Sequence, residues 1–199
     1  MKPKRVLAAV FSFGIQRKKA DPESLSRLLG LTRAEAEAEV ERLSGKGLLK
    51  SVRGRVYLTP KGRKAIKVVF IGGGFEIIHY GHVHTITRAK ELGDALVVSV
   101  ARDSTIRRRK NREPIVGEED RVKLLSSLRQ VDAAILGVKG DIYVTLQKVG
   151  PDVVALGYDQ YHMEDEILKQ ARKRGMKLRV VRLDSPYPGI KTSRLLSEL

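Results

Sequence analysis

The chain has 199 residues, a net charge of +16 and no cysteine. The lack of cysteine excludes a disulfide framework, a thiolate metal site and a thiol nucleophile, and no run of about 18 apolar residues predicts a membrane span. The positive charge suits a polyanion, whether nucleic acid or nucleotide phosphates, and general solubility is the alternative explanation. We expect a cytoplasmic protein with no membrane partner.

The first 66 residues are expected to form a small domain. Helices are predicted at residues 3–15, 22–30 and 33–47, followed by two short strands within residues 48–59 and a further helical turn from residue 60. Asp21 is a typical N-cap of the second helix, and Gly30 is a typical end. With the segment "GLLKSVRGRVYLTPKGRKAI", this order of elements resembles a winged helix-turn-helix domain.

From residue 67 onward, apolar strands alternate with amphipathic helices. The expected strands are residues 67–72, 95–101, 133–138, 152–157 and 177–183, and the expected helices are residues 81–92, 117–128, 142–149, 164–175 and 192–199. Continuous apolar strands between such helices predict a parallel sheet that is covered on both faces. The second domain, residues 67–199, is therefore expected to be a doubly wound, Rossmann-like α/β domain.

Three of the four histidines lie in the stretch "GGGFEIIHYGHVH", residues 72–84. This stretch follows the first strand of the second domain, and ligands of such sheets bind at the carboxyl ends of the strands. The helix that begins near Gly81 presents N–H groups and the positive end of its dipole to a phosphate. His79 and His82 can donate to phosphate oxygens there, whereas packed histidines are the alternative. His84 is expected to be structural.

The same stretch resembles the G-[TG]-F-D-x-x-H-x-G-H signature of the nucleotidyltransferase superfamily. His79-Tyr80-Gly81-His82 matches its HxGH element, and Glu76 stands where the signature has Asp. The resemblance implies a nucleotidyltransferase fold and transfer of a nucleoside monophosphate to a phosphorylated acceptor, with release of pyrophosphate. It also implies that His79 and His82 are catalytic and that Glu76 contacts the acceptor. The nucleotide contacts that it implies in this stretch are Gly73, Gly74, Phe75 and Gly81.

Two later segments extend the resemblance. "IKTSRLL" resembles the ISSTxI element, in which Thr192 and Ser193 match the hydroxyl pair and Lys191 replaces a Ser. "LRQVDAAI" resembles the RxxDxxI segment and provides Arg129. The resemblance implies that these four residues bind the nucleotide. A hydroxyl pair that only caps a helix is the alternative for Thr192 and Ser193.

Residues 102–121, "RDSTIRRRKNREPIVGEEDR", are expected to begin as a basic loop. A solvated charged loop is the alternative to a functional one. In the family, this loop approaches the triphosphate and the acceptor. The resemblance therefore implies a catalytic role for Lys110 and acceptor contacts for Asp103 and Arg112.

The segments "VARDST" and "ALGYDQ" make residues 67–199 most similar to archaeal FAD synthases. That branch implies ATP and FMN as substrates, FAD and pyrophosphate as products, and a divalent cation, expected to be magnesium. No cluster in the sequence identifies the metal ligands. The implied contacts are Gly157, Tyr158 and Asp159 for the nucleotide and Tyr161 for the acceptor, and Tyr158, Tyr161, Phe75 and Tyr187 are candidates for stacking on the flavin.

Two other functions stay open. A cytidylyltransferase that uses CTP and a small phosphorylated alcohol, such as glycerol 3-phosphate, would share the same motifs. A DNA-binding regulator is suggested by residues 1–66, where 16 Lys and Arg stand against 6 Asp and Glu, a net charge of +10. Against DNA, the helix expected to enter the major groove carries Glu35, Glu37, Glu39 and Glu41. Packing or dimerisation is the other role for this domain, and we expect a homodimer.

Overall fold

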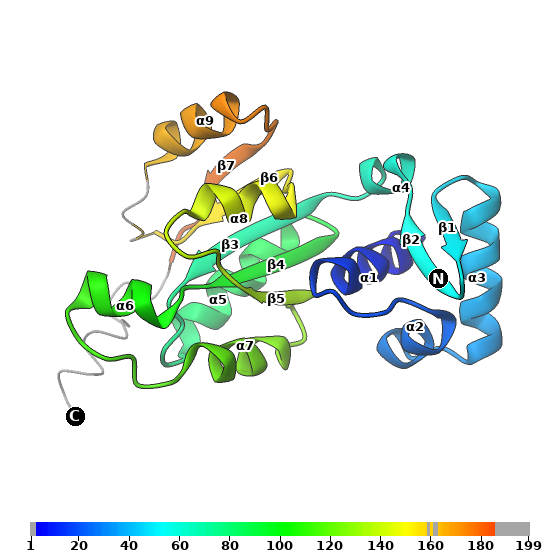
Figure 1. The fold of residues 1–199 in the computed structure, drawn as a ribbon, viewed down its shortest axis with the longest axis horizontal. Helices are drawn as coiled ribbons and strands as arrows, with labels where there is room; N and C mark the ends of the chain where they lie inside the picture. Colours follow the sequence, from blue (N-terminus) through cyan, green and yellow to red (C-terminus); the bar gives the residue numbers. More distant parts are fainter. Residues whose placement is uncertain (1–2, 159, 161–162, 186–199) are drawn as a thin grey trace. The chain divides into compact units, whose positions relative to one another are not determined.

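The structure is a computed structural model that describes residues 3–158, 160 and 163–185. The chain divides into two compact units, Met1–Lys67 and Val68–Leu199, which are described separately (Figure 1). None of the helices in the described ranges is long and apolar enough to cross a bilayer.

The described part of the first unit is helical apart from one hairpin. It contains α1 (Pro3–Ile15), α2 (Pro22–Leu29), α3 (Arg33–Gly45), β1 (Leu49–Val52), β2 (Arg55–Leu58) and α4 (Pro60–Lys64). The expected caps of α2 are confirmed, because the Asp21 side chain accepts from the Ser24 N–H and Gly30 ends the helix with a φ of 68°. β1 and β2 pair antiparallel around Arg53 and Gly54, both at positive φ.

The second unit is a parallel sheet covered by helices, which confirms the expected α/β fold. Its strands are β3 (Val68–Gly73), β4 (Ala95–Val100), β5 (Ala133–Leu136), β6 (Val153–Leu156) and β7 (Arg179–Arg182), and its described helices are α5 (Tyr80–Glu91), α6 (Asp103–Lys110), α7 (Glu118–Ser126), α8 (Ile142–Val149) and α9 (Glu164–Lys173). Helices α5 and α7 cover one face, and α8 and α9 cover the other (Figure 1).

The strand order is β5-β4-β3-β6-β7. The chain moves outward from β3 through β4 to β5, and it then returns to the other side of β3 with β6. Strand order therefore reverses between β3 and β6, which pair through Val69–Val153 and Phe70–Val154. Because ligands of doubly wound sheets bind at this reversal, outside the carboxyl ends of the strands, the topology places the ligand site after β3.

One expectation is corrected in this unit. The basic segment after β4 is not a loop throughout, because Asp103–Lys110 forms α6. Ile106 anchors this helix in the core, and Asn111 ends it with a φ of 50°. The basic residues fill its last turn, where the negative end of the helix dipole favours them. The helix expected at residues 192–199 lies outside the described residues.

Candidate active site

The turn after β3 has a strained backbone that fixes two side chains. Phe75 adopts a φ of 52°, in the left-handed region that side chains other than glycine rarely occupy. Its ring is buried in the hydrophobic core and lies 5.3 Å from the ring of His82. A Cβ on Gly73 would lie 2.9 Å from this ring, so the turn requires glycine there. Phe75 thus packs beneath the site, and its ring is not a surface on which a flavin could stack.

His79 and His82 meet at the start of α5. His79 is the N-cap residue, and the backbone N–H of His82 donates to its carbonyl oxygen at 2.9 Å. The two imidazole ring centroids are 3.9 Å apart. Both rings therefore stand at the positive end of the α5 dipole, beside the reversal in strand order, where the family resemblance expects the transferred phosphate.

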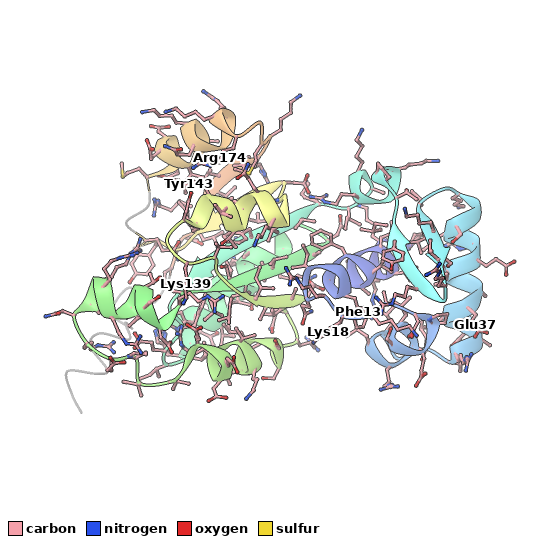
Figure 2. All side chains as sticks on the ribbon, in the orientation of Figure 1. Phe13, Lys18, Glu37, Lys139, Tyr143 and Arg174 are labelled. Carbon is pink, nitrogen blue, oxygen red and sulfur yellow. The ribbon has the colours of Figure 1, made fainter. Side chains whose placement is uncertain are left out.

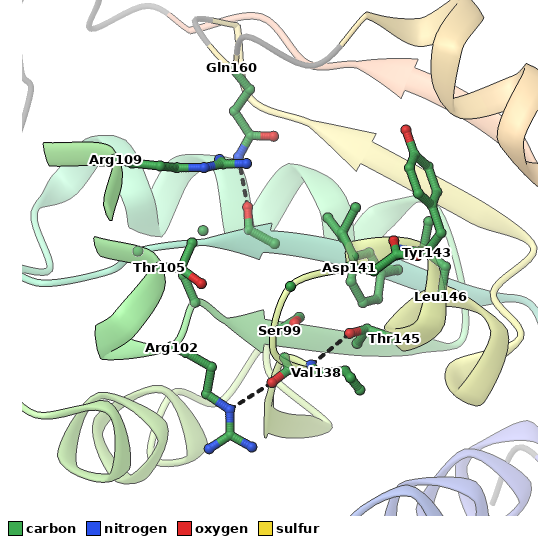
Figure 3. Close-up of a pocket in the computed structure, with 18 of the residues that line it drawn as sticks. Ser99, Arg102, Thr105, Arg109, Val138, Asp141, Tyr143, Thr145, Leu146 and Gln160 are labelled. Carbon is green, nitrogen blue, oxygen red and sulfur yellow. Dashed lines mark hydrogen bonds between the residues drawn. The ribbon is translucent and has the colours of Figure 1, made fainter. Parts of the chain in front are cut away.

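A cavity of about 670 Å³ opens at the carboxyl ends of the strands, on the side covered by α8 and α9 (Figure 3). Its apolar floor comes from the sheet and from α8, and includes Phe70, Ile142 and Leu146. Gly72, Gly73 and Gly74, at the end of β3, also line it. The basic helix α6 forms one wall, along which lie its N-cap residue Arg102 and the helix residues Thr105, Arg108, Arg109 and Lys110.

Hydrogen bonds hold the walls of this cavity in place. Gln160 donates to the Gly72 carbonyl at 2.8 Å, and Arg102 donates to the Gly137 carbonyl at 2.8 Å (Figure 3). On the α8 side, the guanidinium of Arg174 lies 4.9 Å from the ring centre of Tyr143 (Figure 2). Burial raises the pKa of Tyr143, so this phenol stays neutral at ordinary pH. The cavity is thus a fixed apolar chamber with a basic wall.

Glu76 follows Phe75, and none of its side chain is exposed. Its carboxylate accepts hydrogen bonds from Lys110 at 2.6 Å and from both terminal nitrogens of Arg112 at 2.7 and 2.9 Å. Burial raises the pKa of Glu76, but the hydrogen bonds from Arg112 and Lys110 outweigh it and lower the pKa to about 2. The ionised carboxylate therefore engages the two cations that the resemblance assigns to the site.

Arg121, on α7, joins the ends of two strands from within the core, where it is wholly buried. Its guanidinium donates to the carbonyls of Gly74 and Ala101, which follow β3 and β4, and to the Asp103 carboxylate. None of the motifs in the sequence includes this residue. The available signal is its spacing, because Arg121 lies four positions before the buried Leu125 on the same helical stripe.

Residues 70–197 match the cytidylyltransferase-like family. The chain belongs to this family. The matched segment begins at residue 70, so the whole first unit lies outside it and the family assignment concerns the second unit.

Several relatives share this cytidylyltransferase-like segment. The chain is 43% identical over 140 residues to the FAD synthase of Thermococcus kodakarensis, which covers 69% of this chain and 93% of the relative. It is 50% identical over 115 residues to the FAD synthase of Aciduliprofundum boonei, with 58% of this chain and 76% of the relative covered.

Solved structures show the same fold. A crystal structure described as the lipopolysaccharide core biosynthesis protein of Thermoplasma volcanium is 43% identical, has a TM-score of 0.58 and covers 60% of this chain and 98% of its own. The pantoate-beta-alanine ligase of Francisella tularensis, at 18% identity and a TM-score of 0.50, shares the fold over 67% of this chain and 66% of its own. The parallel sheet described above is thus the cytidylyltransferase-like fold.

The described structure brings only some of the expected cytidylyltransferase-like site residues to the rim. Gly157 and Tyr158 follow β6, beside the β3 turn, and the Gly157 carbonyl accepts from Arg182 at 3.0 Å. Arg129 is exposed and precedes β5, so it lies at the opposite, amino-terminal edge of the sheet, and this geometry does not support a nucleotide contact. Asp103 is engaged by Arg121. Asp159, Tyr161, Tyr187, Lys191, Thr192 and Ser193 lie outside the described residues.

Proposed function

We propose that the second unit is an FMN adenylyltransferase, which converts ATP and FMN to FAD and pyrophosphate. The observation that carries the choice of acceptor is the apolar cavity of about 670 Å³ at the carboxyl ends of the strands, which is lined by glycines of the turn that leads to the histidine pair. A planar tricyclic flavin ring needs such a chamber, and cavities of this size are usual for cofactor-sized ligands. The relatives named FAD synthase, at 43% and 50% identity, support the same reaction.

In the proposed reaction, an oxygen of the FMN phosphate attacks the α-phosphorus of ATP in line. The bond to the β-phosphate oxygen breaks, and pyrophosphate leaves with the electron pair. No covalent enzyme intermediate forms, so positioning and charge stabilisation account for the rate. His79 and His82, at the start of α5, would donate to the oxygens of the α-phosphate, and Lys110 would neutralise charge on the leaving pyrophosphate.

The arginines of α6 fit a phosphorylated acceptor. Arg108 and Arg109 line the cavity from adjacent positions. Burial and the neighbouring Arg108 lower the pKa of Arg109, which shows how closely positive charge is gathered there. The FMN phosphate is therefore expected to approach along α6, with the ring on the apolar floor near Phe70 and Leu146.

A divalent cation, expected to be magnesium, would neutralise part of the triphosphate charge. Within the described ranges, no group of three or more His, Asp or Glu side chains could hold a metal ion. Magnesium in nucleotide sites is held largely by phosphate oxygens and water, with only one or two carboxylates. The residues described therefore fit a cation that arrives with ATP.

For the first unit, we propose a winged-helix domain that serves packing or homodimerisation rather than DNA binding. Helices α1, α2 and α3 and the hairpin with Arg53 and Gly54 support the winged-helix type. On α3, Glu37 points outward, pairs with Arg33 at 2.8 Å and is half exposed (Figure 2). Such an acidic surface would repel the phosphates of DNA. A mobility shift of nonspecific duplex that weakens with salt would contradict this assignment.

The reaction can be tested by product chromatography after incubation with magnesium, either FMN or glycerol 3-phosphate, and either ATP or CTP. FAD is expected only in the incubation that contains both ATP and FMN. His79→Ala should lower kcat by about 10²–10³, the usual cost of losing a donor to a developing oxyanion. His84→Ala, the same change five positions further along the chain, within α5, should keep most of the activity. CDP-glycerol is not expected, because a small alcohol would leave most of the cavity empty. Its formation would instead establish the cytidylyltransferase alternative.

A further inference from the structure

The turn after β3 places one carboxylate inside the domain. Because Phe75 takes the left-handed conformation and packs its ring into the core, the next side chain, Glu76, is enclosed as well. An ionised carboxylate without partners is costly to bury, so cations are required beside it. The identity and position of those cations indicate what Glu76 does.

Both cations come from the end of α6 and the residues that follow it, 34 and 36 positions along the chain. Lys110 donates to Oε1 at 2.6 Å, and Arg112 uses two nitrogens, at 2.7 Å to Oε2 and 2.9 Å to Oε1. Both carboxylate oxygens are therefore engaged. These three side chains carry two positive charges and one negative charge, so a single positive charge remains in excess.

The three side chains differ in their access to solvent. The side chains of Lys110 and Arg112 are 41% and 33% exposed, whereas that of Glu76 is 0% exposed. Lys110 also lines the cavity, on the same wall as Arg109. An anion that enters the cavity therefore meets Lys110 first, with the buried carboxylate behind it, and Arg112 binds the same carboxylate. An ammonium group has three donors and a guanidinium five, so both can turn toward phosphate oxygens.

We propose that Glu76 is a positioning residue that acts as an internal counter-anion for the polyphosphate. While no polyphosphate is bound, Glu76 accepts hydrogen bonds from Lys110, on the cavity wall, and from Arg112. When the nucleotide binds, the two cations turn to its pyrophosphate group, and they return to Glu76 when pyrophosphate leaves. This inference rests on the proposed function only for the identity of the acceptor. The anion that it concerns is pyrophosphate, whether free or as part of the nucleotide.

A competing anion has an effect opposite to that of a structural support. If Glu76 competes for the two cations, removing its charge removes the competitor, and pyrophosphate binds more tightly and leaves more slowly. If Glu76 only supported the fold, its removal would let two long side chains disorder, and pyrophosphate affinity would fall. The sign of the change therefore separates the two roles.

The test is calorimetric titration of inorganic pyrophosphate into the full chain and its Glu76→Gln variant, without FMN. Gln keeps the shape of the side chain and removes the charge. We expect pyrophosphate to bind about tenfold more tightly to the variant, because one unit charge is removed a few ångströms from the ligand. In turnover, KM for ATP and kcat should both decrease, since release becomes slow. Unchanged or weaker pyrophosphate binding would overturn the proposal.

Two further variants make the result specific. Glu113→Gln removes a carboxylate that pairs with Arg107 of the same helix at 2.7 Å, but Glu113 is 72% exposed, so pyrophosphate affinity should not change. An equal gain in both variants would mean that net charge explains the effect, and would overturn the proposal.

Lys110→Met, which leaves Glu76 paired with Arg112, should weaken pyrophosphate binding by about tenfold. Retained affinity in this variant would also overturn the proposal, even if Glu76→Gln did not fold. Because none of these titrations uses FMN, a chain that shows the expected pattern but forms no FAD would lose only the proposed acceptor.

Discussion

The two faces of the parallel sheet are filled in different ways. Toward α5 and α7, Ile71 of β3 and Val98 of β4 continue a fully buried core to the strand ends; we call this the packed face. Toward α8 and α9, the paired strand-end residues are Gly72 and Ser99, and Gly137 follows β5; we call this the hollow face. Successive residues of a strand point to opposite faces, so the same strands supply the packed face and the hollow face.

The packed face is expected to determine the stability of the domain, and the hollow face is expected to determine ligand binding. On the packed face, removal of a methylene group leaves a void and costs stability. On the hollow face, the small strand-end residues leave the cavity in which the flavin is expected. Substitutions on the packed face should therefore change the free energy of unfolding, and substitutions on the hollow face should change ligand affinity. The following predictions test this separation.

Arg121 lies on α7, a helix of the packed face, but it also holds the ends of β3 and β4 at the rim of the site. Arg121→Met leaves the Gly74 and Ala101 carbonyls and the Asp103 carboxylate without this buried partner. The free energy of unfolding should fall by about 3–5 kcal/mol, measured by urea denaturation. Lys123→Met, on the exposed side of α7, should change it by less than about 0.5 kcal/mol. Equal losses of stability in the two variants would show that Arg121 does not support the strand ends.

Ser99→Leu tests the hollow face, because Ser99 lines the cavity. The larger side chain points into the cavity, so FMN affinity should fall by at least about tenfold, or 1.4 kcal/mol, in a flavin fluorescence titration. Pyrophosphate binding should stay the same. Ser126→Leu, the same change at an exposed position of α7, is the control. Full FMN affinity in Ser99→Leu would place the flavin elsewhere.

Ile86→Val tests the packed face with a smaller change. Ile86, on α5, is wholly buried in the core cluster. Loss of one methyl group should lower the free energy of unfolding by about 0.5–1.5 kcal/mol. FMN affinity of the folded protein should not change. A loss of affinity without a loss of stability would mean that the two faces are coupled.

A pH dependence is expected at the rim between the faces. Since folding lowers the pKa of Glu76 from 4.5 to about 2, the unfolded chain binds its proton more readily than the folded protein. Its contribution to stability is therefore present above about pH 4.5 and lost as the pH falls toward about 2. Acid unfolding followed by circular dichroism should show a shallower pH dependence in this window for Glu76→Gln. An unchanged slope would contradict the lowered pKa.

Sequence patterns predict the elements of this fold well where the residues alternate regularly. The β-branched runs predict the strands, and the spacing of His79 and His82 predicts that they meet at the start of a helix. The helix α6 was missed because its run of basic residues has almost no apolar periodicity, and only Ile106 reaches the core. Its other supports come from residues distant in sequence or outside the helix, since Arg121 engages Asp103 at its start and Asn111 ends it.

The cavity and the Glu76 cluster could not be predicted from local patterns. The hollow results from Gly72 and Ser99 facing the same side in adjacent strands, and this register appears only once the strands pair. The partners of Glu76 are distant in sequence, and nothing near position 76 indicates which cations will reach it. The motif resemblance placed Lys110 and Arg112 near phosphate but did not indicate that a carboxylate already engages them.

The strand order also has a consequence for how the domain is made. One edge of β3 pairs with β4, which is synthesised soon afterwards, but the other edge waits for β6, because Val69 pairs with Val153, 84 positions later. Until the ribosome has delivered that segment, a fully apolar strand keeps an unpaired row of N–H and C=O groups. Such an edge is a template for association with another nascent chain. Slow or interrupted translation between β5 and β6 should therefore favour aggregation of this domain.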